Sequence, residues 1–227
     1  MKTKYLTLNK DFFKTEDAEK KLLLVIQLTR LISALRINPR ILYYLNDSQL
    51  GQEDNEKLPF VKSILDLSIN QSAILYEALK HYKEILYCKE KIYDFVTDEK
   101  LKIKISDLYS TILNKTFDQW NLIKIIRDKI SFHFDKDIVL KYLKKIDKEE
   151  NFRLGEFDQY NYQLPINKDI IYSAIDNNII IPIIKQYYKS DSYFQDFSNE
   201  IFSKTDELTN FFERIILSLL GDYYYII

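Results

Sequence analysis

Glycine and proline are scarce in this chain, and their scarcity limits its fold more than any other feature of the sequence. Only 3 Gly and 4 Pro occur among 227 residues. Sheet-rich folds need many tight turns, which these two residues usually supply. The sequence therefore predicts an all-α protein, built mainly as an antiparallel helical bundle with few connections.

The balance of charge limits the partners of such a bundle. Hydrophobic residues make up 46% of the chain and charged residues 30%, which is typical of a folded domain. The net charge is −1, from 33 basic and 34 acidic residues. A dedicated non-specific nucleic-acid binder is normally basic. Any contact with nucleic acid must therefore come from a local patch.

The single cysteine and the amino-terminal sequence both bear on where in the cell this protein is expected to be. Cys88 is the single cysteine, so an intrachain disulfide and a multi-cysteine zinc site are both excluded. The first five residues are mostly polar and do not form the apolar segment of a signal peptide. Uninterrupted apolar runs are too short to span a membrane. We expect a soluble cytoplasmic protein with no membrane partner.

Apolar residues recur at helical spacing throughout the first 150 residues. The first helix should end at Asn38-Pro39, because the residue before a proline is pushed out of the helical conformation. Residues 46–57 are polar and are predicted to form a surface loop, after which Pro59 fits the first turn of a helix. The sequence predicts helices over residues 16–37, 59–95, 99–113, 117–134 and 138–146.

The pattern changes after Asp147. Residues 160–164 alternate with period two, which predicts a short strand or an extended arm. A helical stretch should begin at Asp169 and be interrupted at Pro182, and a last helix should run from Phe197 or Thr205 to Leu220. We therefore predict a helical domain over residues 1–150 and a mostly helical C-terminal extension over residues 151–227, packed on that domain.

Residues 126–135 read Ile-Arg-Asp-Lys-Ile-Ser-Phe-His-Phe-Asp and hold one of the two histidines. On a regular helix, Arg127 and His133 would lie about 120° apart around the axis and roughly 9 Å along it. If this face packs against a copy of itself about a two-fold axis, two Arg and two His side chains converge. Histidine titrates near neutrality and arginine binds phosphate oxygens, so the arrangement suits metal-free phosphodiester cleavage.

The motif of Arg127, five intervening residues and His133, with polar Asp128 after the arginine, resembles the R-x4–6-H motif of the HEPN superfamily. Its wider context resembles abortive-infection-type bacterial HEPN proteins. The resemblance covers about residues 15–150 and implies a HEPN-like bundle that forms a homodimer. It also implies a metal-independent ribonuclease without a cofactor, acting in phage defence or as a toxin. His133 would then be the general base on a ribose 2′-hydroxyl, Arg127 the phosphate ligand, and Asp128 the residue that orients one of them.

Basic residues near the motif are candidates for RNA contact, with a solvated helical face as the alternative in each case. A second set, in which lysines alternate with Tyr82, Tyr87 and Tyr93, has acids between its members, so we interpret it as a solvated face. His81 is interpreted as an ordinary surface or interface histidine, and residues 223–225 as part of a core. The RNA-binding candidates are Lys129, Lys141, Lys144 and Lys145.

Two other interpretations of the motif stay open. In the first, the module is a non-catalytic dimerisation or nucleotide-binding adaptor, Arg127 pairs with Asp128 or another carboxylate, and His133 caps a helix end. In the second, the protein is a toxin that is inhibited by an antitoxin protein encoded beside it.

Overall fold

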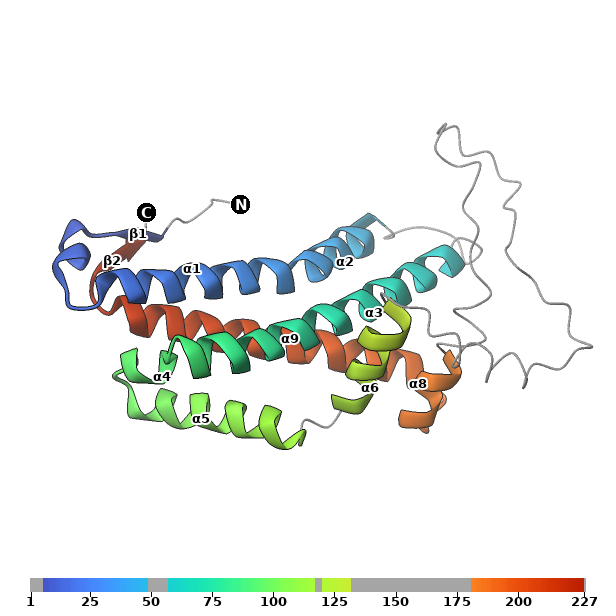
Figure 1. Cartoon of the computed structure of the whole chain (residues 1–227). Coiled ribbons are helices and arrows are strands. Elements are labelled where there is room, and N and C mark those ends of the chain that lie inside the picture. Colours follow the sequence, from blue (N-terminus) through green and yellow to red (C-terminus); the bar gives the residue numbers. More distant parts are fainter. Residues whose placement is uncertain (1–5, 49–56, 117–119, 132–180, 227) are drawn as a thin grey trace, which may run out of the picture.

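The computed structural model describes residues 6–48, 57–116, 120–131 and 181–226. Within these residues the chain is almost entirely helical, which confirms the predicted all-α class. Three long helices lie side by side and form the body of the molecule (Figure 1). They are α1 (Ala18–Leu35), α3 (Lys57–His81) and α9 (Tyr193–Leu220).

The predicted apolar faces of these helices form the core. On α1, Leu24, Leu28 and Leu35 recur at helical spacing and are at most 1% exposed. On α9, Phe212 and Ile215 are fully buried, and this helix packs against both α1 and α3. The predicted boundary at residue 150 lies outside the described residues. The part of the predicted extension that forms α9 contributes to the same core as α1 and α3.

The prediction that the first helix ends at Asn38-Pro39 was wrong, because α1 ends at Leu35 and both residues belong to the next helix. Arg36 keeps right-handed helical angles (φ −88°, ψ −5°), and α2 (Ile37–Ser48) continues in nearly the same direction (Figure 1). Pro39 falls in the first turn of α2, where a missing backbone N–H is tolerated. The predicted loop over 46–57 was therefore wrong at both ends: residues 46–48 belong to α2, and Lys57 begins α3.

One buried side chain joins the three long helices. Gln71 of α3 is fully buried, and its Nε2 donates hydrogen bonds to the Leu35 carbonyl oxygen at 3.1 Å and to Thr205 Oγ1 on α9 at 3.0 Å. Nearby, Ser68 Oγ donates to Ser198 Oγ at 2.9 Å. These buried polar contacts fix how α3 is aligned along α9, because sliding either helix would leave their atoms unpaired.

The predicted helix over 59–95 is interrupted. After His81 the hydrogen-bond pattern widens into the π-helical segment η3 (Tyr82–Lys89). Lys91 then adopts a left-handed conformation (φ 50°), and the short helix α4 (Ile92–Phe95) follows. Asp98 caps α5 (Glu99–Asn114) by accepting from the backbone N–H groups of Lys100 and Leu101, so this predicted helix is confirmed.

The segment that carries the motif begins as α6 (Trp120–Ile125) and continues as the π-helical segment η4 (Ile126–Ser131). The remainder of the predicted helix over 117–134 lies outside the described residues. The same is true of the predicted helix over 138–146, the strand over 160–164 and residues 169–180. Pro182 is the second described residue of α8 (Ile181–Tyr187), and the helical stretch predicted to precede it lies outside the described residues.

The two ends of the described chain pair with each other. Strand β1 (Leu6–Leu8) runs antiparallel to β2 (Tyr224–Ile226), with Leu6 opposite Ile226, and leads into the 3-10 helix η1 (Lys10–Lys14) (Figure 1). The Asn9 N–H also donates to the Tyr223 carbonyl oxygen at 2.8 Å. The sequence pattern indicates residues 223–225 as part of a core and predicts no strand at either end, so this pairing is a finding of the structure.

The segment Ala18–Tyr43 is, by length and composition alone, apolar enough to cross a membrane. Its best window has a mean hydropathy of 1.3, and 28% of that window is buried. Polar and charged residues such as Arg30 and Arg36 divide this segment, so it contains no long uninterrupted apolar run. A core helix of a soluble protein meets the same criteria, and α1 packs along α9 here.

The Gln71 bridge leads to a prediction for stability. Replacing Gln71 with Met keeps the volume but leaves the buried Leu35 carbonyl without its donor, so the free energy of unfolding should fall by about 1–3 kcal/mol. Urea unfolding followed by circular dichroism measures the change. Gln195→Met, on the exposed face of α9, is the control and should stay near the wild-type value.

Tyr82 predicts how stability changes at high pH. Its side chain is fully buried, its hydroxyl donates to the Ile105 carbonyl oxygen at 2.7 Å, and burial raises its pKa. A raised pKa stabilises the fold below the ordinary tyrosine pKa of about 10, and that contribution is lost as the pH rises above it. Tyr82→Phe should lower the free energy of unfolding by about 1 kcal/mol at neutral pH. Above roughly pH 10, the free energy of unfolding of this variant should fall less steeply with pH than that of the wild type. The exposed Tyr187→Phe should change neither quantity in urea titrations at the two pH values.

Candidate functional site

Arg127 lies at the surface in the first turn of η4, directly after a buried residue. Leu122, Ile123 and Ile126 are fully buried and hold this segment against α3. The Arg127 side chain emerges beside them and is 33% exposed. Short π-helical segments are rare and recur at functional sites, because they change the direction of side chains along a helix.

Two carboxylates hold the Arg127 guanidinium. Nη1 donates to Asp128 Oδ1 at 2.7 Å, and Nη2 lies 2.5 Å from Glu77 Oε1 on α3. The contact with Glu77 is an ion pair that is not aligned as a hydrogen bond. Asp128 and Glu77 side chains are 32% and 46% exposed, so each pair is partly screened by solvent.

Aromatic rings form the base of this arrangement. The Arg127 guanidinium carbon lies 5.6 Å from the centroid of the Tyr76 ring, which is within the range of a cation–π contact. The Tyr76 ring in turn contacts Trp120 of α6, with centroids 5.1 Å apart. Tyr76 and Glu77 are neighbours on α3, so one turn of that helix supplies both an aromatic and a charged contact to Arg127.

The surroundings also shift two pKa values. The hydrogen bond to Asp128 raises the pKa of Arg127, with a further increase from Glu77 that offsets the effect of burial. Burial raises the pKa of Tyr76, and the negative charge of Asp128 raises it further. Arg127 is therefore a permanent cation and Tyr76 is a neutral phenol at physiological pH.

This geometry determines which chemistry Arg127 can perform. A guanidinium has five N–H donors. Nη1 and Nη2 each direct one toward a carboxylate, while Nε is buried and has no hydrogen-bond partner among the described residues. One further N–H remains on each of Nη1 and Nη2, and a phosphate that accepted from it would lie beside Asp128 or Glu77. The group is therefore oriented as an anion ligand, but its charge is already balanced.

The structure describes part of the predicted site. Arg127 and Asp128 contact each other, as one of the sequence interpretations required. Lys129 lies in η4, and its side chain is not among those described. Four more predicted site residues lie outside the described residues: His133, Lys141, Lys144 and Lys145. The predicted angle between Arg127 and His133 assumed a regular α-helix, whereas η4 has the wider π-helical hydrogen bonding.

Glu77, Tyr76 and Trp120 were not singled out from the sequence. Glu77 lies at the edge of the apolar face of α3, where an acidic residue is ordinary. Nothing in its local sequence indicates a partner 50 positions later. Only the packing of η4 against α3 brings the two residues together.

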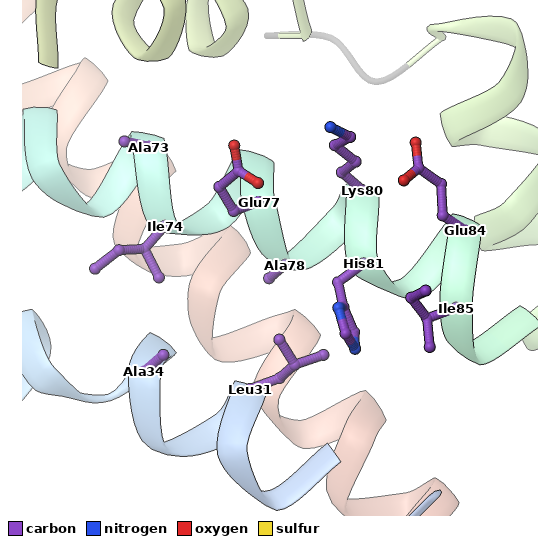
Figure 2. Close-up of a pocket in the computed structure, with 10 residues that line it drawn as sticks. All are labelled: Leu31, Ala34, Ala73, Ile74, Glu77, Ala78, Lys80, His81, Glu84 and Ile85. Carbon is purple, nitrogen blue, oxygen red and sulfur yellow. The ribbon is translucent and has the colours of Figure 1, made fainter. Parts of the chain in front are cut away.

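A hollow of about 490 Å³ lies between α1 and α3, next to this site. His81 points toward α1, whereas Glu77, Lys80 and Glu84 point to the opposite side of α3 (Figure 2). The titratable groups therefore do not converge on one point. The lining also includes Leu31, Ala34, Ala73, Ile74, Ala78 and Ile85.

The segment in which lysines alternate with tyrosines does not form a stacking surface. Tyr82 is fully buried, and Tyr87 stacks on Tyr109 with ring centroids 4.0 Å apart. The lysines of η3 are left without adjacent free aromatic faces, which agrees with their interpretation as a solvated face. Within the described ranges, no group of three or more His, Cys, Asp or Glu side chains could hold a metal ion.

No family model matches the chain, and no match is found among curated proteins or solved structures.

Proposed function

We propose that this protein is a metal-independent endoribonuclease of the HEPN type that acts as a homodimer in phage defence or as a toxin. The observation that carries the proposal is the position of Arg127, which is held at the surface of a π-helical turn by Asp128. A phosphate ligand must be oriented before the substrate arrives, and Asp128 supplies that orientation. The resemblance of residues 126–135 to the R-x4–6-H motif gives the reaction class.

The proposed reaction needs one base and one acid. His133 removes the proton from a ribose 2′-hydroxyl, whose oxygen attacks the adjacent phosphorus atom. The bond to the 5′-oxygen breaks, and the imidazolium of His133 from the second copy donates a proton to that oxygen. Arg127 stabilises the negative charge on the phosphate oxygens. The products are a 2′,3′-cyclic phosphate and a free 5′-hydroxyl.

Glu77 has a role in this proposal that the sequence did not indicate. It balances the charge of Arg127 while the site is empty, and its side chain is 46% exposed. An exposed ion pair contributes little stability, so RNA phosphate can displace Glu77 at small cost. Asp128 keeps its hydrogen bond to Nη1 and continues to orient the guanidinium.

A second candidate function is a non-catalytic adaptor. It is favoured by the two carboxylates around Arg127, which already balance the charge of the guanidinium without a ligand. In this proposal the cluster of Glu77, Arg127 and Asp128 supports the fold or a subunit interface. The two proposals expect different effects of Arg127→Ala on RNA cleavage and on dimer stability.

Cleavage of RNA in EDTA tests the first proposal. Purified protein should produce cyclic phosphate ends, and Arg127→Ala and His133→Ala should each lower the cleavage rate at least about 100-fold. Lys124→Ala is the matched control, because Lys124 is an exposed basic residue one turn earlier on the same segment. It should retain the wild-type rate. Full activity of His133→Ala would reject the assignment.

Size-exclusion chromatography of Arg127→Ala separates the two functions. The ribonuclease proposal expects cleavage to be lost while the dimer remains intact. The adaptor proposal expects no cleavage by the wild type and a weaker dimer in the variant.

Glu77→Gln gives a further prediction for the ribonuclease. The substitution keeps the shape of the side chain and removes the charge that competes with RNA phosphate. The Kd for a non-cleavable RNA should fall by about twofold to tenfold, in line with a partly screened charge contact. Fluorescence anisotropy measures the change, and Glu84→Gln, another acid of the same helical stretch, is the control. Weaker RNA binding by Glu77→Gln would contradict the role assigned to Glu77.

A further inference from the structure

The outward face of α1 and α2 carries a stripe of four large aliphatic side chains. Leu23, Ile26, Ile37 and Ile41 are each between 43% and 52% exposed. At about 100° per residue, all four fall within an arc of roughly 60° on one side of the helix. We call these four residues the α1–α2 stripe. Single exposed apolar residues are common in soluble proteins, but four large aliphatic side chains on one helix face, in two pairs on either side of Arg30 and Ser33, indicate a binding surface.

The charged residues of the same helices are all basic between Glu19 and Asp47. The chain has no acidic residue between Glu19 and Asp47, whereas it has five basic residues there. Lys20 pairs with Asp17, and Arg36 pairs with Glu213. Arg30 and Arg40 are exposed, with Arg30 inside the arc of the stripe and Arg40 about 40° outside it. Glu19 bounds the stripe at its amino-terminal end.

Two acids of the neighbouring helical stretch α3–η3 point away from the stripe. Across the hollow between α1 and α3, Glu77 and Glu84 point away from α1 (Figure 2). Glu77 is also paired with Arg127. His81, which points toward α1, carries no negative charge. The described surface of α1 and α2 therefore combines exposed aliphatic side chains with the exposed guanidinium groups of Arg30 and Arg40.

We propose that the α1–α2 stripe docks the protein onto a lipid surface with anionic headgroups. A helix with an apolar strip and basic residues lies in the plane of such a surface, with its aliphatic side chains at the boundary of headgroups and acyl chains. Arg30 and Arg40 reach the lipid phosphates with their long side chains. This inference does not rest on the proposed ribonuclease activity, and it departs from the sequence-based expectation that no membrane is involved.

Docking on the surface fits the structure better than crossing the bilayer. The inner face of α1, with Leu24, Leu28 and Leu35, is buried against the rest of the bundle. Insertion across a membrane would require α1 to leave α9 and would expose the core of the bundle. Docking uses only the face that the bundle leaves open.

A second copy of the chain is a poorer occupant of the stripe. A two-fold axis near the middle of the stripe would bring Arg30 of one copy next to Arg30 of the other. Only Glu19, at one end, could offset that repulsion, because no other acid lies on α1 or on the part of α2 before Asp47. Anionic headgroups provide the complementary charge along the whole length of the stripe.

Flotation with vesicles tests the proposal on the full-length protein. Wild-type protein should bind vesicles that contain about one third phosphatidylglycerol in phosphatidylcholine, and should bind pure phosphatidylcholine vesicles at least about tenfold more weakly. The double substitution Ile26→Gln and Ile37→Gln should weaken binding to the anionic vesicles at least about tenfold. Arg30→Gln with Arg40→Gln should remove most of the difference between the two vesicle types.

The matched control is Ile103→Gln on α5, a residue that is 61% exposed but lies outside the stripe. It should bind vesicles as the wild type does. Failure of the wild-type protein to bind anionic vesicles would overturn the proposal. So would unchanged binding by the Ile26→Gln and Ile37→Gln variant with its helical circular dichroism signal intact. A shift of that variant from dimer to monomer in light scattering, with no vesicle binding by the wild type, would assign the stripe to a protein interface.

Discussion

The bundle depends on one carbonyl group that a proline leaves without a donor. In an uninterrupted helix the Leu35 carbonyl would accept from the backbone N–H of residue 39, but residue 39 is proline and has none. Gln71 of α3 supplies the missing hydrogen bond and uses its second N–H to reach Thr205 on α9. The missing backbone hydrogen bond between α1 and α2 is thus the place where Gln71 joins α1, α3 and α9.

The same contact sets the position of the candidate site. Glu77 lies six residues beyond Gln71 on α3, or about 9 Å along a regular helix. Because Gln71 fixes the position of α3 along α1 and α9, it also fixes where Glu77 and Tyr76 lie relative to η4. The Arg127 ion pair is exposed and weak by itself, so its geometry comes from the packing of α3 against η4 and not from its own energy.

These contacts explain which features the sequence could predict. The periodic leucines of α1 and the apolar face of α9 are local patterns, and both helices follow from them. The change to π-helical bonding at Tyr82 could not be predicted, because buried residues four apart, such as Tyr82 and Leu86, suit either bonding pattern. The pairing of β1 with β2 joins three-residue strands at opposite ends of the chain, and strands that short carry no clear alternation.

In the candidate site, too, the local contact could be predicted from the sequence and the long-range contact could not. Arg127 and Asp128 are adjacent in the sequence, so a contact between them was a natural alternative to a substrate-binding role. Glu77 is 50 positions away, and a prediction of its contact with Arg127 would have required the helix packing. The sequence therefore indicated the cation and one of its carboxylates but not the second, Glu77, which gives the cluster of one guanidinium and two carboxylates a formal charge of −1.

The two long helices α1 and α9 show that the α1–α2 stripe is not a general property of this bundle. Both helices bury one face in the same core. The exposed face of α9 is polar or charged at most positions, as in Asp206, Glu207, Asn210 and Arg214, with Leu217 as the exposed aliphatic residue. The exposed face of α1 and α2 has aliphatic residues at the corresponding turns and no acid after Glu19 until Asp47. A helix that only had to cover the core would be expected to resemble α9, and the difference agrees with the lipid docking proposed for the α1–α2 stripe.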